Sequence, residues 1–207
     1  GDEASMRAAA AAAARFGVVL GAHPSYPDRL NFGRVSLAID PVTLEHALAE
    51  QIAALREIAR ATGLALTRVK PHGALYNDAH RDRTLADVIV RAMRRAGGEL
   101  ALVASDRSQM AAAARDAGVD VVREAFADRR YRADGSLSPR SEPGSLLTID
   151  ESAVQAGHLA TDGFVAAGDG TRVAFAFDTL CIHADMEQAV ERLMAIRQRL
   201  GMATEAG

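Results

Sequence analysis

The chain has 207 residues, of which 24 are Lys or Arg and 27 are Asp or Glu, so its formal net charge is −3. This balance gives no electrostatic reason to expect nucleic acid or an anionic membrane as a partner. Hydrophobic residues make up 49% of the chain and aromatic residues 4%, which predicts a sizeable core built from Ala, Val, Leu and Ile.

The hydrophobic period alternates between helix-like and strand-like along the whole chain. In chain order it predicts a helix at 4–15, a strand at 18–20, a helix from Asp40-Pro41 to Gly63, a strand at 66–69, a helix at 79–96, a strand at 100–104, a helix at 106–117, a strand at 119–122, a helix at 150–166, a strand at 175–182 and a helix at 185–200. Strands separated by helices form a parallel sheet through right-handed crossovers. We therefore expect one α/β domain over 1–207. The periodicity leaves both an open doubly wound sheet and a closed barrel as alternatives.

Cys181 is the only cysteine in the sequence, which rules out an internal disulfide and fits a reducing compartment. We read it as a packed core residue, not a nucleophile. No apolar run reaches the roughly 20 residues needed to span a bilayer, and the chain does not begin with a basic stretch followed by an apolar one. These features predict a cytoplasmic protein.

Polar side chains gather where the predicted strands end. His23 follows the first strand, Lys70 and His72 follow the second, and His183 follows the last. Because the carboxyl ends of parallel strands lie near one another, we expect these side chains to form one polar site. A lysine directly after an apolar strand favours a functional cation, since a buried charge is costly unless it is paired.

Other polar residues have simpler readings that stay open. Glu124 and Asp128 could be a carboxylate pair or ordinary solvent-facing charges, and Asp185 could simply be the N-cap of the last helix. Five residues are suitable metal ligands, but no two have a tight metal-binding spacing, so no metal site is predicted; they are His23, Asp28, His72, His183 and Asp185. The chain also lacks both common phosphate-binding glycine loops, so any ATP would be bound by other means or by a partner chain.

Four ordered motifs resemble those of the LamB/YcsF family. They are GAHPSYPD at 21–28 with NFGR at 31–34, VKPHGALYN at 69–77, EAFADR at 124–129 continuing through Tyr131 to Gly144, and CIHAD at 181–185. The resemblance implies a distorted, seven-stranded parallel barrel of the glycoside hydrolase/deacetylase type. Its first two strands would be missing from this chain. A departure is Ala184, where the family more often has Gly.

The resemblance also implies an activity. The family acts as one component of a three-component enzyme, with B and C subunits, that opens 5-oxo-L-proline to L-glutamate with ATP as co-substrate; a divalent cation is left open. Chemistry of this kind needs a base for water, donors for an oxyanion and cations for phosphate. The expected catalytic residues are His23, Asp28, Lys70, His72 and Asp128, with Asp28 or Asp128 orienting one of the two histidines. The expected substrate- or phosphate-binding residues are Tyr26, Arg34, Asn77, Glu124, Arg129, Arg140, Ser141, His183 and Asp185.

Two other functions remain as alternatives. The first is a metal-dependent deacetylase or amidohydrolase that acts alone, with His23, His72 and Asp28 as ligands, and it predicts a bound ion in the purified protein. The second is a non-enzymatic protein that binds a small acid and signals through partners. Neither alternative accounts for the four motifs together.

Overall fold

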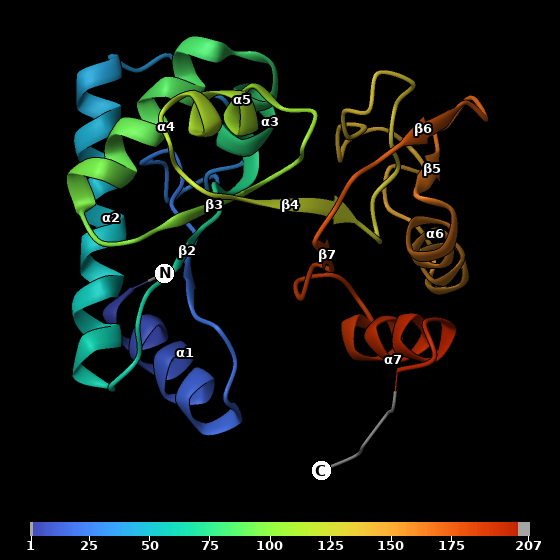
Figure 1. Cartoon of the computed structure of the whole chain (residues 1–207), viewed down its shortest axis with the longest axis horizontal. Coiled ribbons are helices and arrows are strands. Elements are labelled where there is room, and N and C mark those ends of the chain that lie inside the picture. Colours follow the sequence, from blue (N-terminus) through green and yellow to red (C-terminus); the bar gives the residue numbers. More distant parts are fainter. Residues whose placement is uncertain (1, 203–207) are drawn as a thin grey trace. The chain divides into compact units, whose positions relative to one another are not determined.

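The computed structural model describes residues 2–202, and Figure 1 shows its helices and strands. The chain divides into two compact units, one ending at Val122 and the other beginning at Arg123. The strand β4 (Val121–Phe126) begins in the first unit and ends in the second. The assignment of one domain stays a prediction.

The first unit begins with two long helices whose ends follow the expected signals. In α1 (Glu3–Phe16), the alanine-rich run forms a helix that ends at Gly17 with φ 63°. In α2 (Pro41–Ala61), Asp40 caps the helix by accepting a hydrogen bond from Thr43 N, and Pro41 occupies the first turn. The apolar face of α2 packs against α4 (Arg83–Ala96) (Figure 1).

The helix expected at 79–96 is two helices in the structure. The first is α3 (Gly73–Arg81), and Asp82 lies between it and α4 with extended backbone. The Asp82 side chain accepts a hydrogen bond from Leu85 N, so it caps the second helix. The next helix is α5 (Gln109–Asp116), which Ser108 caps in the same way.

The strands of the first unit are short and parallel. They are β1 (Gly21–Ala22), β2 (Arg68–Val69) and β3 (Ala101–Ala104), with β2 between the other two. Beyond β3 the ladder continues toward β4, since Leu102 N donates to Asp120 O at 2.8 Å. The strand expected at 18–20 was misplaced: Val18 and Val19 are 56% and 69% exposed, and the pairing starts only at Gly21.

In the second unit, β4 pairs in parallel with β7 (Thr179–Cys181), which completes a sheet of order β1-β2-β3-β4-β7. The helix expected at 150–166 stops earlier: α6 (Ile149–Asp162) ends at Gly163, whose φ is 67°. The chain then forms an antiparallel hairpin of β5 (Phe164–Ala166) and β6 (Arg172–Ala174), which was not predicted from the sequence. The last helix, α7 (Ala189–Arg199), packs against α6.

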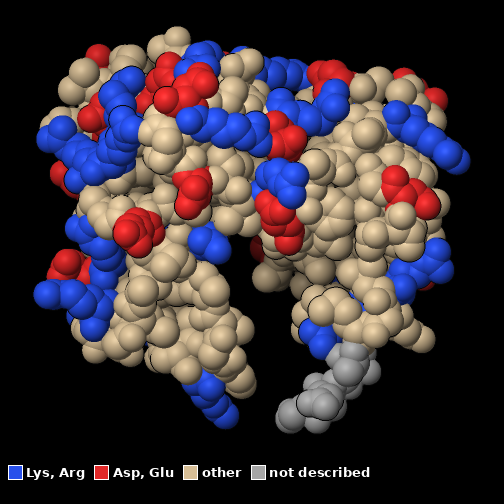
Figure 2. Space-filling model, viewed as in Figure 1, with Lys and Arg blue, Asp and Glu red and all other residues tan. Residues whose placement is uncertain are grey.

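The α/β class and the five parallel strands are therefore confirmed, while the seven-stranded barrel stays a prediction. None of the helices in the described part of the chain has the length and apolarity needed to cross a membrane. On the face drawn in Figure 2, basic and acidic side chains are interspersed in each unit, in keeping with the balanced charge of the sequence.

Candidate active site

The register of β1 and β2 brings His23 and His72 together. Lys70 N donates to Ala22 O at 2.9 Å and His72 N donates to Pro24 O at 2.8 Å, so the parallel pairing continues past both strands. Paired strands lie only about 5 Å apart. Two histidines separated by 49 positions therefore become neighbours at this end of the sheet.

The two rings form a chain of hydrogen bonds between two backbone carbonyls. His23 Nδ1 lies 2.6 Å from Lys70 O, His23 Nε2 lies 3.0 Å from His72 Nδ1, and His72 Nε2 lies 2.9 Å from Phe32 O. The rings meet edge-on, with centroids 4.8 Å apart and planes at 78°. The Phe32 ring makes a similar edge contact with His72, at 5.2 Å. The backbone of both neighbouring segments therefore sets the orientation of both rings.

Asp28 shapes the loop that carries the Phe32 carbonyl and does not itself orient a histidine. Its carboxylate accepts from the Asn31 backbone N at 3.2 Å and from Asn31 Nδ2 at 2.8 Å. Its own carbonyl accepts from Gly33 N at 2.9 Å. Between these contacts Phe32 has φ 55°, a region that non-glycine residues seldom adopt. The expected direct pairing of Asp28 with His23 or His72 was therefore wrong; its role is to position the Phe32 carbonyl.

Two glycines allow this loop to touch the start of α3. Gly73 has φ 59°, and a Cβ there would lie 2.5 Å from Gly33 O. Ala74 N donates to the same oxygen at 3.0 Å. Gly33 has φ 64°, and a Cβ there would lie 2.7 Å from Ser25 Cβ. Only glycine fits either position, because both the left-handed backbone and the close approach exclude a side chain.

Tyr26 anchors the same loop to α3. Its side chain is buried, and its hydroxyl donates to Asp78 Oδ2 at 2.9 Å, while Ser36 Oγ donates to Asp78 Oδ1 at 3.0 Å. Burial, and then the Asp78 carboxylate, raise the pKa of Tyr26 well above its ordinary value. Tyr26 therefore remains a neutral donor to Asp78, an anchoring contact that the prediction of substrate binding did not include.

The other predicted residues of the first unit surround the histidine pair. Lys70 is half-buried directly after β2, and Asn77 is exposed on α3. Arg34 is exposed, with its Cζ 5.1 Å from the centroid of the Phe32 ring. Two cationic residues thus belong to the segments on either side of the pair.

In the second unit, Asp128 and His183 form a dyad. His183 N donates to Asp128 Oδ2 at 2.6 Å, and His183 Nδ1 lies 3.0 Å from each carboxylate oxygen. The Asp128 side chain is fully buried, and the Phe126 ring stacks on His183 with centroids 5.8 Å apart. Both residues were predicted from the sequence, but in different roles and not as a pair.

The charge of this dyad follows from its contacts. Burial alone would raise the pKa of Asp128, but the hydrogen bonds and charge of His183 outweigh it, so the net pKa lies below the usual range. Asp128 is therefore an ionised acceptor at neutral pH, and His183 Nδ1 carries a proton that it donates. His183 Nε2 is then left as the basic nitrogen, which is how a buried aspartate prepares a histidine for general-base chemistry.

Arg129 is a buried cation next to this dyad in the chain. Its Nη2 donates to Ser138 O at 2.6 Å, while its buried Nε has no hydrogen-bond partner among residues 2–202. Burial, followed by the charge of nearby Arg140, lowers the pKa of Arg129 to about 10. The side chain remains positive at neutral pH. A buried positive group with an unsatisfied N–H is suited to binding an anionic group.

Arg140 and Asp185 face each other, with Arg140 Nη2 3.8 Å from Asp185 Oδ1. The expected N-cap role of Asp185 was wrong, because α7 begins four residues later and follows Gln188. Ser141 is exposed in the turn after Arg140, whereas Glu124 is buried in β4.

Gln155, which was not predicted from the sequence, organises the segment after β4. From α6, its Nε2 donates to Phe126 O at 2.8 Å and to Arg129 O at 2.9 Å. Gln155 lies one turn before the buried Leu159, on the apolar face of the helix. A polar residue at that position was the signal that could have found it, because a buried amide needs partners.

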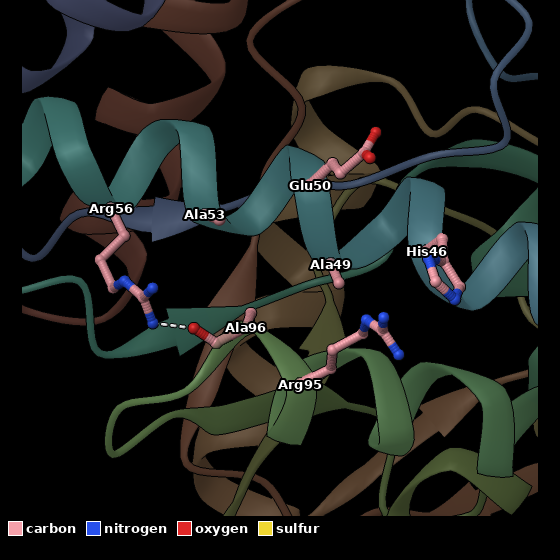
Figure 3. Close-up of a pocket in the computed structure, with 7 residues that line it drawn as sticks. All are labelled: His46, Ala49, Glu50, Ala53, Arg56, Arg95 and Ala96. Atoms are coloured by element: carbon pink, nitrogen blue, oxygen red, sulfur yellow. Dashed lines mark hydrogen bonds between the residues drawn. The ribbon is translucent and has the colours of Figure 1, made fainter.

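The structure also contains an open pocket of about 260 Å³ between α2 and the end of α4 (Figure 3). Glu50, Arg56 and Arg95 supply its charged lining, and Arg56 Nη1 donates to Ala96 O. None of the predicted site residues lines it. We therefore do not regard this pocket as the active site.

The donor arrangement does not support a protein-built metal centre. Within residues 2–202, no group of three or more His, Cys, Asp or Glu side chains is placed to hold a metal ion. Asp28, the expected third ligand beside His23 and His72, is bound to Asn31 instead.

Comparisons with known proteins identify the family. Residues 1–206 match the model of the LamB/YcsF family. The A subunit of 5-oxoprolinase from Neisseria meningitidis serogroup A is 43% identical over 97% of this chain and 82% of its own length. The A subunit from Chloroflexus aggregans is 45% identical over 98% of this chain and 81% of its own length.

A solved structure shows the same fold. The lactam utilization protein from Thermus thermophilus is 41% identical, and the superposition covers 97% of this chain and 81% of that one with a TM-score of 0.88. The motifs, the parallel α/β fold and these similarities lead to one assignment: the chain belongs to the LamB/YcsF family.

Proposed function

We propose that the chain is the A subunit of a 5-oxoprolinase, which opens 5-oxo-L-proline to L-glutamate with ATP and together with B and C subunits. The observation that carries the proposal is the similarity to proteins named as the A subunit of 5-oxoprolinase, at 43–45% identity over 97–98% of this chain. The Asp128–His183 dyad and the buried Arg129 supply side chains with the required chemistry.

The chemistry sets what this chain would need. The lactam of 5-oxoproline is an unstrained amide, so water must be activated by a base and the carbonyl oxygen must be stabilised or phosphorylated. His183 Nε2, held by Asp128, would act as the base. Arg129 would hold an anionic group, either the substrate carboxylate or a phosphate of ATP. A divalent cation would enter with the ATP phosphates.

In the first unit, Lys70 would bind an anionic group. It directly follows a strand, which fixes its backbone through the contact with Ala22. Lysine binds phosphate as a compact point charge. The sequence offers no phosphate-binding glycine loop, so part of the ATP contact is assigned to the B and C subunits.

The test is reconstitution of the three subunits with ATP and 5-oxo-L-proline, with glutamate and ADP measured in the same samples. Glutamate and ADP should form in step and disappear when this chain is omitted. Glutamate formed at the full rate without this chain would contradict the proposal, as would a folded complex that never produces it.

A variant tests the role of His183 as the general base. His183→Gln should lower kcat by at least about 100-fold while KM changes little, because the glutamine cannot accept a proton. His158→Gln is the matched control, since His158 also lies near an aspartate, Asp162, but on the exposed side of α6. Equal activity of the two variants would remove His183 from the mechanism.

A further inference from the structure

The segment that follows β1 is held to β2 by an incomplete ladder. In a parallel pair, every second residue of one strand directs both its N–H and its C=O toward the other strand. Ala22 faces β2 in this way, because its carbonyl accepts from Lys70 N. Pro24 also faces β2, and its carbonyl accepts from His72 N. Pro24 has no N–H to donate to Lys70 O, and His23 Nδ1 lies 2.6 Å from that oxygen instead.

Ser25 is the next residue, and a side chain binds its backbone on the edge away from β2. Gln51 Oε1 accepts from Ser25 N at 3.0 Å, and Gln51 Nε2 donates to Ser25 O at 2.9 Å. The reverse assignment of the amide would set donor against donor and acceptor against acceptor, so the two contacts fix its orientation. A primary amide offers the same donor and acceptor as the peptide groups of a strand. The side chain of Gln51 therefore takes the place of a neighbouring strand at Ser25.

The position of Gln51 in α2 places this contact on the packed face of the helix. Gln51 lies seven residues after Leu44 and four before Leu55, and both leucines are buried. This spacing puts the three side chains on one face of a helix. A glutamine on an apolar face is costly unless its amide is paired. The two contacts with Ser25 supply that pairing.

Two helices fix the segment that carries His23. On one side, Gln51 connects Ser25 to α2, a helix of 21 residues that packs against α4. On the other side, Ser25 Oγ donates to Tyr26 O at 2.9 Å, and the Tyr26 hydroxyl donates to Asp78 of α3. The place of this segment is therefore set by the packing of the helices as well as by the short strand β1.

We infer that Gln51 is a positioning residue: its amide holds Ser25 and thereby sets the register in which the segment after β1 meets the end of β2. Because Pro24 contributes only its carbonyl to that pairing, loss of the amide loosens the backbone bonds of Lys70 and His72 as well. Only the consequence for turnover rests on the proposed function, in which Lys70 would bind an anionic group.

The direct test is amide hydrogen exchange of the whole chain, followed by NMR. Gln51→Met keeps the approximate length of the side chain and removes both contacts. Exchange at Ser25, Lys70 and His72 should become about tenfold faster, as expected for the loss of about one hydrogen bond. Exchange at Ala101 of β3, which pairs with the other edge of β2, should stay unchanged.

The pattern of the exchange rates decides the outcome. Faster exchange at Ser25 alone would overturn the inference, because the contact would then act only locally. An equal acceleration at Ala101 would also overturn it, since the amide would then support the whole unit and not one register. Gln198→Met, at an exposed glutamine of α7, is the matched control and should leave all of these rates unchanged.

Gln51→Glu is the second variant, and it decides the question if Gln51→Met does not fold. A protonated carboxyl group can accept from Ser25 N and donate to Ser25 O, whereas a carboxylate can only accept and is opposed by the carbonyl. The pKa of the introduced group should therefore be higher in the folded than in the unfolded chain. Relative to wild type, the variant should be most stable below about pH 4.3 and lose stability as the pH rises through the folded pKa.

Urea unfolding at several pH values measures this difference. Gln198→Glu introduces the same group at an exposed site and should show no such pH dependence. A stability difference between Gln51→Glu and wild type that does not change with pH would contradict the paired contacts with Ser25.

The consequence for the reaction has its own readout. In the three-subunit enzyme, Gln51→Met should lower kcat/KM by about tenfold, while Gln198→Met should not change it. Unchanged kcat/KM beside faster exchange at Lys70 would overturn the role of Gln51 in the reaction. No glutamate from wild-type subunits in any combination would instead defeat the proposed function and leave the exchange result standing, because exchange needs no substrate.

Discussion

Both units place histidines where parallel strands end, but they orient them by different means. His183 in the second unit is held by the buried carboxylate of Asp128, whereas His23 and His72 in the first are held by backbone carbonyls and by each other. A carboxylate fixes the tautomer and also stabilises a positive ring when the histidine takes a proton. Carbonyls fix the orientation but supply no full charge. The carboxylate of the second unit therefore suits a histidine that accepts a proton, whereas the carbonyls of the first unit determine only how the two rings are oriented.

The largest expected effect of a substitution is at Asp128, the residue that distinguishes the second unit from the first. Asp128→Asn should lower kcat by roughly 10²–10⁴-fold, because an amide that donates to His183 Nδ1 forces the proton onto Nε2. Asp150→Asn, in the exposed first turn of α6, is the control and should remain close to wild type. Steady-state glutamate release measures both variants, and a kcat within threefold of wild type for Asp128→Asn would show that the dyad is not the base.

Asp128 also predicts acid sensitivity. Its folded pKa lies below the unfolded value, so its contribution to stability is complete above about pH 3.9 and is lost as the pH falls through the folded value. Asp128→Asn should remove that part of the acid-induced loss, which urea unfolding at several pH values would measure.

In the first unit, the largest expected effect on turnover is at Lys70. Lys70→Met keeps the length of the side chain and removes its charge, so turnover should fall by at least about 100-fold while the fold is retained. Lys70→Arg separates charge from shape and should recover part of the activity. Wild-type turnover in the methionine variant, with unchanged circular dichroism, would remove Lys70 from the mechanism.

The orientation of the histidine pair depends on the close contact between the two glycines. Gly73→Ala should lower the free energy of unfolding by about 2–4 kcal/mol, since its Cβ would lie 2.5 Å from Gly33 O at a φ of 59°. Gly118→Ala also has a left-handed backbone, but with open space around it, and should cost only about 1 kcal/mol. Urea unfolding compares the two, and equal losses would show that the close approach is unimportant.

The smallest effect is expected at Gln155, which positions the segment carrying Asp128. Gln155→Leu leaves buried carbonyls of Phe126 and Arg129 without their donor, which should cost about 1–3 kcal/mol of unfolding free energy. Gln155→Glu keeps the shape but replaces the donor with an acceptor, so it should be at least as destabilising. A neutral effect of both variants would assign the segment's position to other contacts.

Most of the secondary structure could be predicted, and the errors share one cause. The capped helix from Pro41 and the alanine-rich helix before Gly17 were correct because their ends are encoded in neighbouring residues. The hairpin after Gly163 was missed because its short strands continue the apolar pattern of the preceding helix. The possible N-cap role of Asp185 was not borne out, because an aspartate before an apolar run looks the same whether or not the helix starts there.

The candidate site could also be predicted only in part. The residue types and their places after strands were visible in the sequence, and so was the resemblance that led to the family. The sequence did not show which side chains contact each other. Asp128 and His183 are 55 positions apart and His23 and His72 are 49 apart, and only the register of the sheet brings each pair together.

The sequence by itself determined the α/β class, the parallel sheet and the family, because these depend on local periodicity and on ordered motifs that each lie within a short stretch. Only the tertiary structure decided which histidine meets a carboxylate and which meets a carbonyl. That choice depends on strand register, since a slip of one residue would turn each side chain to the other face of the sheet, and on the close approach of Gly33 to Gly73. Such distances arise from packing between remote segments, and no local pattern encodes them.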